Sequence, residues 1–250
     1  MADYVPDQLT PYTFDDAREG MGWALGNALN RSPSLDTLAL ALAKSALETG
    51  RWRSIHRHNV GNTKCPIETP AQDYTVFGCN ELLQRGGKTV VVWFSPTAEL
   101  TGKGGSAVGQ VYELPPGHPQ CRFTAHANRY DGFDYYVSFL QRPRYAKPFA
   151  ALLAGNPEAF VRTLAAAGYF TAPVEQYLAT VMSLFREFRA KLQAQPHEEV
   201  PLPESKWDWH AGLTGLDVAW HSVQDDLNRG AAQHQREFDA DVDPFAEPNE

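Results

Sequence analysis

Residues 34–50 read SLDTLALALAKSALETG, and this stretch predicts a buried helix at the centre of the fold. Ser34 is a suitable N-cap, and Asp36 places a negative charge in the first turn, where the helix dipole favours it. Apolar side chains fall on more than one face, which is typical of a helix surrounded by other elements. Because Gly50 is the usual kind of residue just beyond a helix end, we expect the helix to span residues 35–49.

Further segments with apolar residues at helical spacing lie on both sides of this stretch. They cover residues 13–30 before it, and residues 127–141, 144–154, 157–167 and 172–192 after it. Thr13 is a suitable N-cap for the first of them. Asn156-Pro157 is a good helix start, since proline is favoured at the first helical position.

Between the two groups of helices, from residue 51 to about residue 120, glycine, proline, asparagine and threonine become frequent. The pattern predicts strands at residues 74–83, 89–94 and 121–124, a hairpin connection at 84–88 and a Gly-rich loop at 101–109. The order helices, strands, helices predicts a mainly helical α+β fold.

We expect one domain over residues 1–195, with a small β part at about residues 60–125. Residues 195–205 contain three prolines and two consecutive glutamates, and predict a linker. Residues 207–230 predict a helix that carries Trp207 and Trp220 and either docks a protein partner or packs on the main domain. The last sixteen residues, 235–250, hold one arginine against six acidic residues, and predict a disordered tail.

Composition excludes several classes of function. The 22 basic and 30 acidic residues leave a formal net charge of −8, and no basic run is present, so nucleic acid is not expected as a partner. No stretch approaches the roughly 18 consecutive apolar residues of a membrane span. Residues 1–16 are polar and acidic, without the basic and apolar regions of a signal peptide. We therefore expect synthesis in the cytoplasm and no signal-dependent export.

Cysteine and histidine spacing indicates neither a metal site nor a disulfide framework. The three cysteines, Cys65, Cys79 and Cys121, are odd in number and do not match zinc-ligand spacing, so we expect buried thiols, with a single disulfide as the alternative. His56 and His58 could bind a metal ion together, but no third ligand is evident. We expect no metal and no cofactor.

The candidate catalytic residue is Glu48, near the end of the apolar helix. Burying a carboxylate costs several kcal/mol, so a glutamate in such a place tends to take up a proton. A protonated carboxyl is what a general acid working near neutral pH requires. The alternative is a plain exposed glutamate at a helix C-terminus, where the dipole is mildly unfavourable to it.

Four phrases in order resemble a known family. The first is ALETG at residues 46–50, and the second is NVGNTK at 59–64. The third is RFTAH at 122–126 with GFDYY at 132–136, and the fourth is AGYFT at 167–171 with Tyr177-Leu178. Together they span roughly residues 34–190. In this order they resemble the bacterial endo-β-N-acetylglucosaminidases of glycoside hydrolase family 73.

The resemblance implies a lysozyme-like, two-lobed fold with a helical lobe, a small β-lobe and a central cleft. It implies that Glu48 is the general acid and that Tyr169 and Tyr177 shape the cleft beside it, although both could be core aromatics. Asn62 would touch the sugar, or else belong to a tight turn around Gly61.

The resemblance also implies a second carboxylate, for which we favour Glu81 on the strand predicted at residues 74–83. Glu68 and Asp73, in the preceding loop, are the rivals. The sequence departs from the family here, because the segment at 99–118 makes the β part longer. Arg51-Trp52-Arg53 also stands where the family commonly has Trp-Gly.

The function implied is hydrolysis of the β-1,4 bond between N-acetylglucosamine and N-acetylmuramic acid, so the expected partners are the glycan strands of peptidoglycan. A lytic transglycosylase or muramidase of the same superfamily is the first alternative. The second belongs to another class, a non-catalytic structural component of a phage tail or injection machine. Without a signal peptide, the expected routes to the cell wall are lysis, phage delivery or non-classical export.

Overall fold

The computed structural model describes residues 3–65, 73–85, 88–95, 108–113, 121–170 and 172–194, with the backbone alone described for 80–85, 88–93, 95 and 108–113. The chain divides into two parts, Met1–Leu202 and Pro203–Glu250. The predicted linker, the predicted helix at residues 207–230 and the acidic tail lie outside the described residues.

Every helix expected within the first 194 residues is confirmed, with ends that differ from the prediction by at most two residues. The helices are α1 (Phe14–Leu29), α2 (Leu35–Glu48), α3 (Arg129–Leu140), α4 (Ala146–Leu153), α5 (Pro157–Ala166) and α6 (Val174–Ala194), with a 3-10 turn η1 (Pro143–Tyr145) before α4. None of the described helices is long and apolar enough to cross a membrane.

The helix starts follow from their capping residues. The Thr13 side chain accepts a hydrogen bond from the Asp16 backbone, and the Asp16 carboxylate accepts one from the Thr13 backbone, which makes a capping box at α1. Ser34 caps α2. Asn156 caps α5 and Pro157 is its first residue, as expected. These local bonds explain why the helix starts could be located from sequence.

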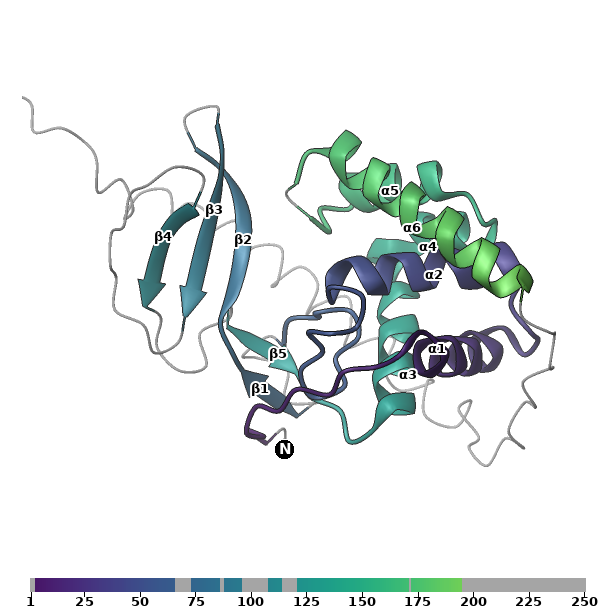
Figure 1. Cartoon of the computed structure of the whole chain (residues 1–250), viewed down its shortest axis with the longest axis horizontal. Helices are drawn as coiled ribbons and strands as arrows, with labels where there is room; N and C mark the ends of the chain where they lie inside the picture. Colours follow the sequence, from purple (N-terminus) through teal and green to yellow (C-terminus); the bar gives the residue numbers. More distant parts are fainter. Residues whose placement is uncertain are drawn as a thin grey trace, which may run out of the picture. The chain divides into compact units, whose positions relative to one another are not determined.

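Helix α2 lies at the centre of the helical part and contacts α1, α4 and α6 (Figure 1). Nine of its residues are buried: Thr37 and the unbroken run of eight from Ala39 to Ala46. Because its neighbours approach from several directions, the apolar residues on more than one face are all covered. The packing of these neighbours therefore fixes the position of the end of α2 and of the side chain that it carries there.

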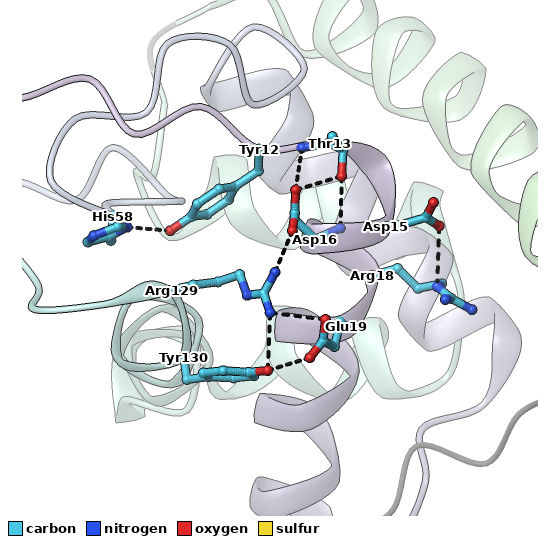
Figure 2. Close-up of polar contacts among 9 residues, drawn as sticks. All are labelled: Tyr12, Thr13, Asp15, Asp16, Arg18, Glu19, His58, Arg129 and Tyr130. Carbon is cyan, nitrogen blue, oxygen red and sulfur yellow. Dashed lines mark hydrogen bonds and ion pairs between the residues drawn. The ribbon is translucent and has the colours of Figure 1, made fainter.

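A polar network joins the N-terminal ends of α1 and α3 (Figure 2). The Arg129 guanidinium lies 2.5 Å from Asp16 and 3.0 Å from Glu19. The Tyr12 hydroxyl lies 2.6 Å from Nδ1 of His58, which connects the chain before α1 to the loop after α2. Each half-exposed ion pair is worth no more than about 1 kcal/mol, so the network orients the helices more than it stabilises them.

The described strands form two small sheets. They are β1 (Tyr74–Val76), β2 (Cys79–Arg85), β3 (Lys88–Ser95), β4 (Val108–Glu113) and β5 (Arg122–Thr124). β1 pairs antiparallel with β5, while β3 pairs antiparallel with β2 and parallel with β4. The predicted hairpin is confirmed, with Arg85 opposite Lys88, and so is the strand at residues 121–124.

Two strand predictions are wrong in part. The single strand expected at residues 74–83 is two strands, because the chain changes its pairing partner from β5 to β3 around Phe77 and Gly78. The Gly-rich loop expected at 101–109 overlaps β4, which begins at Val108. Pairing with β3 stabilises this strand despite its glycine, an example of tertiary context overriding local propensity.

The three cysteines form no disulfide. Cys65 and Cys121 are buried, as expected, and Cys79 is partly buried. A hydrogen bond with the Cys79 thiol, together with burial, raises the pKa of the Cys121 thiol well above its usual range. The expected α+β class is confirmed: the described chain is mainly helical, with a small β part.

Candidate active site at the end of helix α2

Glu48 is the last residue of α2 and stands where the chain leaves the core. The Thr49 hydroxyl donates to the Ser45 carbonyl, and Gly50 follows with a φ of +56°. This left-handed turn ends the helix at once and directs the chain away from it. The Glu48 side chain keeps 21% of its surface exposed, so its carboxylate lies between the buried core and solvent.

Two donors hold the same oxygen of the Glu48 carboxylate. Nζ of Lys44 lies 2.5 Å from Oε1, and the Tyr177 hydroxyl donates to Oε1 over 2.8 Å. Within the described part of the chain, no hydrogen bond reaches Oε2. The carboxylate at the end of this apolar helix is therefore contacted by an ammonium and a hydroxyl.

Three tyrosines surround this ion pair. The Tyr169 ring centroid lies 4.0 Å from Nζ of Lys44, within the range of a cation–π contact. Burial raises the pKa of Tyr136, Tyr169 and Tyr177 well above the usual value, and the negative charge of Glu48 adds to the effect. All three hydroxyls therefore stay protonated at any pH at which the protein would act.

The loop after α2 closes the other side of the site. The Asn62 side-chain amide donates to the backbone carbonyl of Glu48, and Asn62 has a φ of +48°. The Ser45 hydroxyl donates to the Val60 carbonyl over 2.7 Å. A Cβ on Gly61 would lie 2.3 Å from the ring of Tyr136, so this position needs glycine for close approach. The loop is thus held against the end of α2.

The structure brings four of the predicted site residues together. Glu48, Asn62 and Tyr177 are linked by hydrogen bonds, and Tyr169 joins them through its hydroxyl, which lies 3.4 Å from the Gly61 carbonyl. The side-chain amide of Asn62 donates to the backbone of Glu48, and the Tyr169 ring packs on Lys44. For each of these two residues, the alternative of a structural role therefore has direct support.

The second carboxylate is not among the residues brought together. The backbone of Glu81 lies in β2, opposite Val92 of β3, and its side chain lies outside the described part of the structure. Of its rivals, Glu68 lies outside the described residues, and Asp73 is exposed and accepts a hydrogen bond from the Asp3 backbone. The assignment of Glu81 stays a prediction.

Sequence reasoning missed Lys44, whose ammonium lies closer to the Glu48 carboxylate than the Tyr177 hydroxyl does. The available signal was its spacing, because residues four apart on a helix lie on the same face. Across the described residues, no group of three or more histidine, cysteine, aspartate or glutamate side chains could hold a metal ion. His56 pairs with Asp7, and His58 contacts Tyr12.

Comparisons with known proteins do not show a family. No family model matches the sequence, and no curated protein matches it significantly. Among solved structures, the chain is similar to a peptidoglycan hydrolase mutant from Sphingomonas sp. A1, with 20% sequence identity and a TM-score of 0.45 over 72% of this chain and 99% of that one. A likeness this low decides neither family nor activity.

Proposed function

We propose that the protein is a peptidoglycan hydrolase with a lysozyme-like fold, in which Glu48 is the general acid. The observation that carries the proposal is the state of the Glu48 carboxylate. It stands at the end of a buried helix, is anchored through Oε1, and keeps part of its surface exposed. A fixed carboxyl that reaches solvent from a rigid element is suited to proton transfer to a bound substrate.

In the proposed reaction, Glu48 protonates the oxygen of the β-1,4 bond between N-acetylglucosamine and N-acetylmuramic acid as the bond from that oxygen to the anomeric carbon breaks. Positive charge then develops on the sugar ring, and a second carboxylate stabilises it or activates water. We assign this second role to Glu81, with Glu68 and Asp73 as rivals. The order of the four family-like phrases in the sequence supports the choice of substrate.

The choice of bond is the finer part of the proposal. A lytic transglycosylase or muramidase would use Glu48 in the same way and cut on the other side of the muramic acid. Mass spectrometry of digested murein separates these reactions, because a transglycosylase leaves anhydro-muramic ends. Reducing N-acetylglucosamine ends would support the glucosaminidase, and reducing muramic acid ends would support the muramidase.

Zymography on murein with the full chain tests the role of Glu48. Glu48→Gln keeps the size of the side chain and removes the acid, so we expect a folded protein with activity lower by about 10²–10⁴-fold. Glu158→Gln is the matched control, since Glu158 is an exposed glutamate on α5; it should keep wild-type activity. More than half of wild-type activity in Glu48→Gln would refute the proposal. A wild type that never clears murein would favour the non-catalytic, structural alternative.

A further inference from the structure

Lys44 has no exposed surface, which is unusual for a lysine. Removing an ammonium group from water costs several kcal/mol unless a partner of opposite charge compensates for it. Burial lowers the pKa of Lys44, and the neighbouring Glu48 carboxylate opposes this change. The positive charge of Lys44 therefore depends on a negative charge at Glu48.

The groups that face this pair from the packed elements are tyrosines. Tyr136 comes from α3, Tyr169 from the segment after α5, and Tyr177 from the first turns of α6. Each carries a hydroxyl whose pKa is raised by burial and by the Glu48 charge, so none of them titrates before the pair does. The protonation of the site thus depends on Lys44 and Glu48.

The charge of Lys44 and the charge of Glu48 depend on each other. A proton added to Glu48 would remove the partner of a fully buried ammonium 2.5 Å away, so the charges of the two groups are coupled. A general acid, however, must carry a proton when it acts. Lys44 is therefore in a position to limit how far up the pH scale Glu48 can serve as an acid.

We propose that Lys44 is a positioning residue of the Glu48 site: its ammonium holds Oε1, leaves Oε2 for the substrate, and sets the pH range in which Glu48 can donate a proton. The inference rests on the proposed function, because it assumes that Glu48 is the acid. It goes beyond that function by assigning the control of the acid to a buried lysine one helical turn before it.

The first test is the pH profile of murein cleavage by the full chain. Lys44→Met keeps much of the length of the side chain and removes its charge, so Glu48 should stay protonated to higher pH. Because this variant removes the opposite charge beside the carboxylate, we expect the alkaline limb of the profile to move to higher pH. A purely structural role of Lys44 would lower activity equally at every pH.

Lys191→Met is the matched control. Lys191 also pairs with a glutamate four residues away, Glu187, at 2.9 Å, but its side chain is 48% exposed on α6. Removing this charge should leave the pH profile of the wild type. If Lys44→Met is insoluble, Lys44→Gln replaces it, since it also removes the charge and keeps a polar group near Oε1.

The second test needs no catalysis. In full-length protein labelled with ¹³C at the glutamate carboxyl carbons, the Glu48 signal is assigned by its loss in Glu48→Gln and then titrated. Its midpoint should rise in Lys44→Met and in Lys44→Gln. If the midpoint and the pH profile are unchanged in both variants, the inference is overturned. If the midpoint rises but the wild type does not cleave murein, the electrostatic link is supported and the proposed function is wrong.

Discussion

Acid should destabilise the protein through His126, which is buried between β5 and α3. Its ring lies 4.8 Å from that of Tyr135, its Nε2 lies 3.2 Å from the Thr124 hydroxyl, and its backbone amide donates to the Arg57 carbonyl. Burial is the main cause that lowers its pKa from 6.5 to about 4, and the charge of nearby His58 contributes. The folded protein therefore binds this proton less readily than the unfolded chain does.

The sign and size of the effect follow from linkage. Because the folded-state pKa is depressed, the neutral imidazole contributes full stability above pH 6.5, and the contribution falls as the pH drops towards 4. With 1.36 kcal/mol per pKa unit, the free energy of unfolding should fall by about 2 kcal/mol between pH 8 and pH 5. The loss should reach about 3 kcal/mol near pH 3.

Urea denaturation at pH 8 and pH 5 measures this effect in wild type and in His126→Gln. The amide keeps hydrogen-bonding capacity but does not titrate, so the variant should lack the part of the acid destabilisation that comes from His126. Titrating groups that do not interact with His126 contribute equally to both proteins. The difference between the two losses isolates His126, and equal losses in the two proteins would refute the reasoning.

Two further substitutions test the packing around the site. Gly61→Ala should lower the free energy of unfolding by about 1–3 kcal/mol, since the new methyl group would meet a buried tyrosine ring. The control is Gly22→Ala in α1, where a Cβ has nothing within 4 Å, and it should not be destabilising. Thermal unfolding compares the two variants. Ser45→Ala should lower the free energy of unfolding by about 1–3 kcal/mol, because the buried hydroxyl donates to a backbone carbonyl and accepts from an indole N–H. The control Thr180→Ala, on an exposed part of α6, should change it by no more than about 0.5 kcal/mol. Urea denaturation measures both. A Gly61→Ala or Ser45→Ala protein as stable as its control would contradict the described packing.

The sequence by itself determined the helices and where they begin. Thr13, Ser34 and Asn156 each cap a helix through a bond to a residue three positions along the chain, so the information is local. It also determined the candidate residue at the end of α2, because an apolar helix that ends in glutamate is visible in the sequence alone. The order of elements, and hence the α+β class, followed from the same local patterns.

Only the tertiary structure decided which segments pair and what contacts Glu48. The break between β1 and β2 depends on two different pairing partners, one of which lies more than forty residues further along the chain. Tyr177 donates a hydrogen bond to Glu48 although the two residues are 129 positions apart in the sequence. Lys44 is close to Glu48 in the sequence, but only the packing of the surrounding helices buries its ammonium. Burial and distant contacts depend on the packing of the whole chain, and local patterns do not carry that information.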